Sequence, residues 1–433
     1  MSLQQFPGGN RLPYVEPIAD GEGASMREMR RERNFRLRLI FGMCIAWALC
    51  SLAPIWKYLS YPKAATATLA GLLSIALGMY WLDRLNRRDH QISLGWFLLL
   101  YVVLSTAFVI LYPISLKHTL NHGSDREDAL RIELTAVRHH QYPYDTRTFL
   151  GNPPTPLPGA MLLAVPFFEI GHIAWQNFLW LALFFCFTIR FFRYRATALL
   201  FLTVLLLFAL SNLSDLTSGG DYLANLFYVI ISMMCFAESS PRQASCFIPA
   251  AIFLGLTLSS RGIYFLVLIP MFVLTLQRVG RVRTAILFGI VLATATLVTI
   301  PIFLPHPVTN LLRQLGQNSD KLRYIPNTLH PQWTIPLLAL AVICSSFFVR
   351  MNLPRLFLIL GASSFVMLAP PIATLAAHMG KLPYECSYLS VSVLFFSLWA
   401  LSKYELASEA TYISGRQSLP STEEAICNLR SAS

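Results

Sequence analysis

The chain has 433 residues, of which 55% are hydrophobic and 13% charged, and a formal net charge of +12. Soluble globular proteins carry a charged share of about 25%, so this composition excludes a soluble protein of this length. The basic residues flank apolar stretches instead of forming a patch. They therefore indicate membrane topology by the positive-inside rule, and we expect no nucleic-acid partner.

Apolar stretches close to the roughly 20 residues needed to cross the hydrocarbon core recur along the chain. They lack the alternation of a barrel strand, so they predict helices. We predict an all-α, polytopic membrane domain over residues 37–402, with about 11 to 13 transmembrane helices. The stretches are Leu37–Trp56, Ala64–Leu82, Leu94–Leu116, Ile173–Ile189, Ala196–Asn212, Tyr222–Ala237, Thr284–Leu304, Ile335–Val349, Leu356–Ala369 and Ser387–Ser402.

Two polar tails flank this domain, at residues 1–36 and 403–433. The first tail lacks the apolar core of a signal peptide, and arginines crowd its end, so we expect it in the cytoplasm. Three spans later, the long loop at about 117–157 is then expected on the outer side. This pattern predicts a multi-pass integral membrane protein, which we expect in a bacterial inner membrane.

Two regions leave the number of spans open. Pro158–Ile189 is either one span preceded by a partly inserted segment or a tight pair of spans. Phe247–Leu276 is interrupted at Ser259-Ser260-Arg261-Gly262, which indicates two short helices that meet at a polar break. The arginine clusters fit best if the first region crosses once and the second crosses twice.

The long outer loop is predicted to contain a surface helix. Ser124 and Glu127 form a capping-box pattern, which predicts a helix that starts at Asp125. Leu130, Leu134 and Val137 follow at helical spacing and give one apolar stripe. This pattern is typical of an amphipathic helix that lies at the membrane surface.

Asp125 and Asp128 stand in the first turns of this helix, and two interpretations remain open. Acids at a helix start complement the helix dipole. Alternatively, one of the two is a general base that faces an acceptor hydroxyl. His118, His122 and Asp125 also share a helical spacing that suits a metal, but such spacings arise by chance, and we predict neither a metal nor another cofactor.

Proline dominates the end of the loop. The sequence runs Tyr142-Pro143-Tyr144-Asp145 and then Gly151-Asn152-Pro153-Pro154-Thr155-Pro156-Leu157-Pro158-Gly159. Proline fixes an extended, stiff path. Such a segment serves as a rigid entry into the next helix, and rigid loops also hold catalytic groups in place.

The segment His118–Phe168 resembles GT-C superfamily glycosyltransferases, in particular the bacterial mannosyltransferase branch that uses polyprenyl-phosphate sugars. The resemblance rests on the early acid, the amphipathic helix, the Pro143-Tyr144 pair and the proline-rich entry into an apolar helix. It implies transfer of a sugar from a polyprenyl-phosphate donor to a glycan or lipid acceptor on the outer side. It also implies that Asp125 or Asp128 is the base and that Tyr144 lies in the substrate site.

Downstream residues complete the predicted site. Asp221 and Asn225 open a helix after Gly219-Gly220, where related transferases have a different glycine and asparagine pattern; the bland interpretation is an acidic helix start. Arg261 interrupts an apolar region, and its planar fork suits a phosphate; the alternative is a topological charge at a loop. His378 and Lys381, in a late outer loop, are further candidate substrate ligands.

Two other classes of function remain open. A transporter or flippase of a lipid-linked or anionic solute also has broken helices and charges near the membrane midplane. A structural assembly subunit would depend on no single acid. The chain contains no Walker, dinucleotide-binding, zinc-protease or serine-hydrolase motif, so these patterns give ATP-driven transport and hydrolysis no support.

Overall fold

The computed structural model describes residues 23–87, 92–116, 125–307, 309–310, 314 and 322–417, and these form helices and loops without a strand. The α-helices are α1 Gly23–Tyr58, α2 Tyr61–Arg87, α3 Leu94–Ser115, α4 Arg126–Arg138, α5 Pro158–Glu169, α6 Gln176–Phe191, α7 Arg195–Leu202, α8 Leu210–Thr217, α9 Tyr222–Ser239, α10 Ala244–Leu258, α11 Leu268–Val279, α12 Arg281–Phe303, α14 Pro331–Cys344, α15 Leu353–Met379 and α16 Ser390–Gln417. The shorter helices are η1 Pro143–Asp145, η2 Ile173–Trp175, the π-helix η3 Thr203–Phe208, η4 Gly262–Val267, η6 Asn327–Leu329, η7 Ser345–Phe348 and η8 Tyr384–Leu389.

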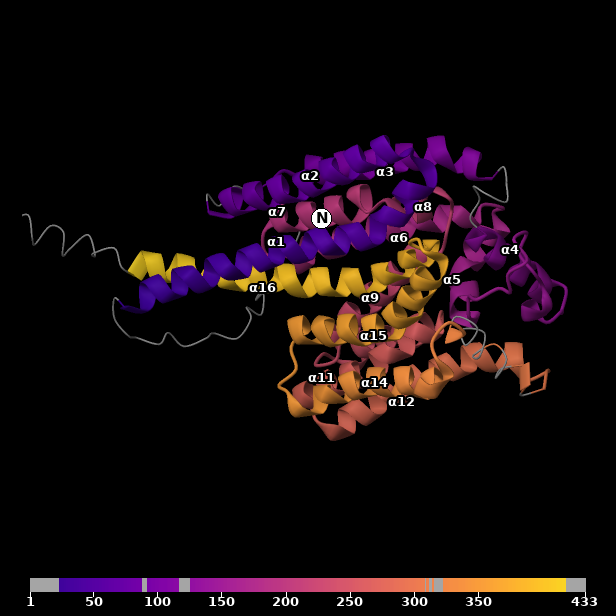
Figure 1. The fold of residues 1–433 in the computed structure, drawn as a ribbon. Helices are drawn as coiled ribbons and strands as arrows, with labels where there is room; N and C mark the ends of the chain where they lie inside the picture. Colours follow the sequence, from indigo (N-terminus) through magenta and orange to yellow (C-terminus); the bar gives the residue numbers. More distant parts are fainter. Residues whose placement is uncertain are drawn as a thin grey trace, which may run out of the picture.

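The long helices run roughly side by side (Figure 1). Among the described residues, nine helices are long and apolar enough to cross a membrane, and a bent pair raises this number to ten. Three shorter apolar helices, Leu37–Ala53, Pro158–Glu169 and Ala244–Leu258, accompany them. The described residues thus contain fewer candidate spans than the 11 to 13 expected. The prediction of an all-α, polytopic membrane protein is confirmed.

Helix α9 is the most enclosed of the candidate spans, with 78% of its apolar window buried. α6 and α10 pack along it, and the core includes fully buried aromatic rings such as Tyr228, Phe184 and Phe227. By contrast, α2, α3 and α12 have only 22% of their windows buried. Apolar helices with so much open surface suit a surrounding of lipid, which requires no polar covering.

The two ends of α9 define two ends of the molecule. Its first residues contact Arg126 and Arg261, whereas its last turn contacts Arg190 through Glu238 and Arg278 through the carbonyl of Ala237. We call these the α4 end and the arginine end. Figure 1 shows α4 beyond one end of the long helices. α4, the first part of the long loop that the structure describes, thus lies at the end of α9 that is opposite Arg190 and Arg278.

The two doubtful regions have different structures. Pro158–Ile189 forms the short helix α5, a turn at Gly171, and then one candidate span, Ile173–Phe191. Phe247–Leu276 forms α10 and then η4 with α11, separated at Ser259–Arg261. Each region therefore contains one candidate span, Ile173–Phe191 and Gly262–Val279, next to a shorter apolar helix.

The predicted span Ala196–Asn212 is broken. Arg195–Phe208 and Leu210–Thr217 meet at an angle of 72°. The backbone groups freed at the break are bound by α1: Trp47 Nε1 and Ser51 Oγ donate to the carbonyl of Phe208, and Ser51 Oγ accepts from the amide of Leu210. Side chains from a neighbouring helix therefore replace the hydrogen bonds that the break removes, as apolar surroundings require.

Candidate functional site

Helix α4 anchors the long loop to the bundle. It begins at Arg126, one residue later than expected, and Ser124 lies outside the described residues. The carboxylate of Glu127 accepts a hydrogen bond of 2.9 Å from the hydroxyl of Tyr112 in α3. This contact with a span was not predicted from the capping pattern.

The predicted apolar stripe of α4 is confirmed. Leu130 and Leu134 are buried, and Val137 packs against the same cluster, which includes Tyr142 and Phe303. Because the stripe faces the bundle, the opposite face of α4 is available to solvent or a ligand.

Asp125 and Asp128 both bind the loop that follows η1. Asp125 Oδ2 accepts hydrogen bonds of 2.8 Å from the hydroxyl of Thr148 and the amide of Asn152. Asp128 Oδ2 accepts from the backbone amide of Phe149 at 2.9 Å, and its Oδ1 lies 4.0 Å from Nη2 of Arg131. Asp125 thus binds two side chains of the loop. Asp128 binds one backbone amide, and its other oxygen has only a long ionic contact with Arg131.

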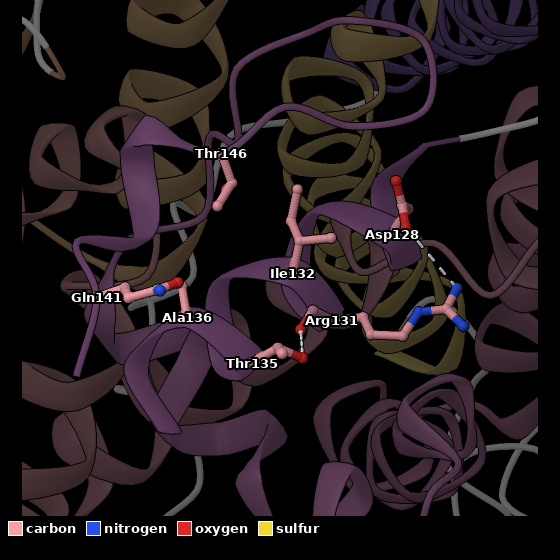
Figure 2. A pocket seen from close by; sticks show the side chains of 7 residues that line it. All are labelled: Asp128, Arg131, Ile132, Thr135, Ala136, Gln141 and Thr146. Carbon is pink, nitrogen blue, oxygen red and sulfur yellow. Dashed lines mark hydrogen bonds and ion pairs between the residues drawn. The ribbon is translucent and has the colours of Figure 1, made fainter. Parts of the chain in front are cut away.

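Asp128 also borders an open pocket of about 470 Å³, which we call the loop pocket. Its lining is polar apart from one isoleucine and one alanine. Figure 2 shows these side chains, which come from α4 and the residues after it. They are Asp128, Arg131, Ile132, Thr135, Ala136, Gln141 and Thr146. An acid, a cation, hydroxyls and an amide around one hollow suit a hydroxylated ligand.

The contacts of Tyr144 stabilise the fold of the loop. Its ring is buried and stacks on Phe303 with centroids 5.4 Å apart, and its hydroxyl donates to the carbonyl of Pro156 at 3.1 Å. It therefore braces the proline-rich segment. Two backbone hydrogen bonds also hold that segment. The amides of Leu157 and Gly159 donate to the carbonyls of Ser260 and Ser259, which come shortly before η4.

Arg261, Asp221 and Asn225 are brought together at the start of α9. Arg261 Nη2 lies 2.7 Å from both carboxylate oxygens of Asp221, and the amide of Asn225 donates to Asp221 at 2.9 Å. Arg261 Nη1 donates to the hydroxyl of Thr155 in the proline-rich segment. The side chains of Arg261 and Asp221 are 11% and 0% exposed, so this is a buried ion pair.

A second buried pair was missed from the sequence. Arg126, the first residue of α4, pairs with Asp215 of α8 and donates to Ser387 of η8. The ring of Tyr222 lies between the two guanidinium groups, 4.9 Å from that of Arg126 and 5.5 Å from that of Arg261. We call these five residues, Arg126, Asp215, Asp221, Tyr222 and Arg261, the ion-pair cluster.

Burial opposes the charge of both arginines in this cluster. Asp215 together with Tyr388 and Tyr384 outweighs that effect and raises the pKa of Arg126. Asp221 together with Tyr264 and Tyr388 does the same for the pKa of Arg261. Both guanidinium groups are therefore charged at any pH at which the protein is folded.

Glu133 of α4 was also missed, although it lies on the predicted stripe, three residues after Leu130 and four before Val137. Its side chain is fully buried, and neither carboxylate oxygen has a hydrogen-bond partner. Burial and the charge of Asp221 raise the pKa of Glu133 well above its usual value, and Arg261 opposes this only in part.

The remaining candidates lie at or after the end of α15. His378 is exposed and stacks on Tyr324 with centroids 4.3 Å apart, and Lys381 is exposed just after Gly380.

Of the proposed metal face, His118 and His122 lie outside the described residues. Within the part of the chain that the structure describes, no group of three His, Cys, Asp or Glu residues could hold a metal ion.

The chain matches no known family model, no curated protein and no solved structure. What it does must therefore be argued from the loop pocket, the ion-pair cluster and the resemblance of the loop sequence.

Proposed function

We propose that this protein is an integral-membrane glycosyltransferase that uses a polyprenyl-phosphate sugar as donor. The acceptor is a glycan or a lipid, bound at the α4 end, which we place on the outer side of a bacterial inner membrane. The observation that carries the proposal is the loop pocket, in which Asp128 borders an open hollow of about 470 Å³. A general base needs this kind of access to an acceptor hydroxyl.

Asp128 is the better candidate for the base, and Asp125 for a structural role. Asp125 uses one oxygen to hold both Thr148 and Asn152, which shapes the loop. Asp128 lines the loop pocket, and its Oδ1 has only a contact of 4.0 Å with Nη2 of Arg131. In this proposal Asp128 takes the proton of the acceptor hydroxyl as the hydroxyl oxygen attacks the sugar, and the lipid phosphate leaves with the electrons of the broken glycosidic bond.

Arg261 would receive the donor phosphate at the edge of the ion-pair cluster. Two of its three nitrogens are engaged, Nη2 with Asp221 and Nη1 with Thr155. Its buried Nε has no hydrogen-bond partner, and a phosphate oxygen would supply one. A charge-assisted hydrogen bond of this kind stabilises negative charge on a leaving phosphate.

One observation favours a transporter or flippase instead. Helices α7, η3 and α8 form a broken span with a bend of 72°, and broken spans build substrate sites in transporters. A transporter would not need Asp128 for chemistry.

The decisive experiment is transfer of label. Purified protein is incubated with radiolabelled polyprenyl-phosphate sugars and a membrane extract as acceptor source. We expect label in a product that resists mild acid, which releases sugar from the donor. Asp128→Asn should lower transfer roughly 100-fold or more, while Asp145→Asn, which alters an exposed aspartate in the same loop, should not. Movement of the intact donor across vesicles without transfer would support the transporter.

A further inference from the structure

Glu133 is the most anomalous group at the α4 end. Its side chain is 0% exposed, and both carboxylate oxygens lack a partner. An ionised carboxylate is strongly disfavoured in such surroundings, and the usual result is that the group keeps a proton.

The groups around Glu133 lead to the same conclusion. Asp221 and Arg261 face it from the start of α9 and of η4, and the phenol of Tyr144 faces it from η1. Of the other elements packed on α4, α5 carries Glu169, which pairs with Arg138, and η2 carries no titratable side chain. Arg261 already has both carboxylate oxygens of Asp221 at 2.7 Å, so it cannot fully neutralise a second carboxylate.

The charges of the cluster balance only if Glu133 is neutral. Arg126 pairs with Asp215 and Arg261 pairs with Asp221, one cation to one anion. Two buried donors beside these pairs lack acceptors, Nε of Arg261 and the hydroxyl of Tyr264, three residues farther along in η4. A buried polar group without a partner calls for one, which a water, an ion or a bound ligand can supply. Since both are donors, the ligand that suits them is an acceptor, such as a phosphate oxygen.

We propose that Glu133 gates an anion site at Arg261: a lipid phosphodiester binds when Glu133 carries its proton and is expelled when Glu133 ionises. The reason is electrostatic, because an ionised Glu133 would compete with the anion for the positive charge of Arg261. Glu133 is a positioning residue in this scheme, since it acts through Arg261. The inference rests on the proposed function and deepens it, because it assigns a regulation to the donor site.

The experiment measures binding, so it does not require turnover. The probe is the methyl ester of a polyprenyl phosphate, whose single negative charge does not titrate near neutral pH. Its dissociation constant is measured on the purified full-length protein across the pH range in which the protein stays folded. We expect the wild-type constant to rise toward tenfold per pH unit once Glu133 ionises, as linkage to one proton requires.

Variants identify the group that causes the pH dependence of binding. Glu133→Gln keeps the shape and stays neutral, so its affinity should match the low-pH wild type at every pH; Glu133→Leu serves the same purpose if Gln does not fold. Glu169→Gln, on the neighbouring helix α5, should keep the wild-type slope. Tyr264→Phe should weaken binding several-fold without changing the slope.

Each alternative outcome would refute a defined part of the proposal. A Glu133→Gln protein with the wild-type slope would refute the gate and leave the lipid-phosphate donor standing. Dimethyl phosphate binding as tightly as the lipid probe would refute the lipid class of ligand. Failure of the probe to bind wild type at any pH would refute both the gate and the donor assignment.

Discussion

Nη2 of Arg261 lies 2.7 Å from both carboxylate oxygens of Asp221, and the two side chains are almost completely enclosed. The pair joins the break after α10 to the start of α9, the most enclosed candidate span. It also reaches the proline-rich segment through Thr155. Three parts of the chain that are distant in sequence therefore depend on one ionic contact.

Asp221→Asn should destabilise the protein strongly. Removal of one partner leaves a buried charge unpaired, which costs about 3–5 kcal/mol. The double variant Asp221→Leu with Arg261→Met should recover part of this loss, because no buried charge remains. The free energy of unfolding in mixed micelles tests both. Glu238→Gln is the matched control, since its pair with Arg190 is exposed and worth less than about 1 kcal/mol.

Asp128→Asn should lower the rate of sugar transfer roughly 100-fold or more, as expected for loss of a general base. The binding of donor should change little, because Asp128 would act on the acceptor. Asp125→Asn should instead loosen the loop at Thr148 and Asn152 and lower thermal stability. Turnover and melting temperature, measured on both variants, separate the two roles. Near-normal turnover in both would exclude this loop as the catalytic element.

Gln141 should face the outer side of the membrane. It is exposed beside the loop pocket, at the end opposite the arginine clusters, and arginine-rich ends stay in the cytoplasm. Cysteine at Gln141, with the native cysteines replaced by alanine, should react with an impermeant thiol reagent on intact cells. Cysteine at Arg281, exposed at the arginine end, should react only after lysis. The reverse pattern would invert the topology.

Glu133 should make stability fall as pH rises. Burial and Asp221 hold its pKa in the folded protein well above its usual value, while in the unfolded chain it is about 4.3. Between these two values the folded protein binds more protons than the unfolded chain, so the free energy of unfolding decreases with increasing pH. Below the lower value the effect vanishes. Melting curves of wild type and Glu133→Gln over this window should diverge, with the variant less sensitive to pH.

Gly159→Ala should displace the proline-rich segment. An added Cβ would lie 2.3 Å from the carbonyl oxygen of Leu256 and 2.4 Å from Oγ of Ser259. Overpacking of this kind costs about 1–3 kcal/mol. Gly262→Ala, three residues after Ser259, meets no atom within 4 Å and is the control. Limited proteolysis of the loop should accelerate in the first variant alone.

The sequence predicted what depends on local pattern. Apolar length identified the spans, Ser259–Gly262 marked the break, and the spacing of Leu130, Leu134 and Val137 identified α4. Long-range pairing has no such local pattern. Arg126 and Asp215 are 89 positions apart, and nothing in either neighbourhood indicates the other.

Glu133 is a different case, because its burial could have been predicted from the sequence. The position three residues after Leu130 and one before Leu134 lies on the buried stripe, so helical periodicity alone places an acid on an apolar face. The bend after Phe208 was hidden for another reason: residues 204–210 are uniformly apolar, and the side chains of Trp47 and Ser51 that bind the backbone at the bend come from α1, far away in sequence.

That bend has a consequence for the order of assembly. The backbone at Phe208 and Leu210 is satisfied by Trp47 and Ser51, which enter the membrane early because synthesis starts at the amino terminus. Helix α1 is therefore made before the break whose backbone it binds, and the break follows some 160 residues later. α8 leads from this break to Asp215, which holds the first residue of α4. A ribosome that has not yet made α8 has therefore released an α4 that can already bind Tyr112 of α3 but still lacks the partner of Arg126.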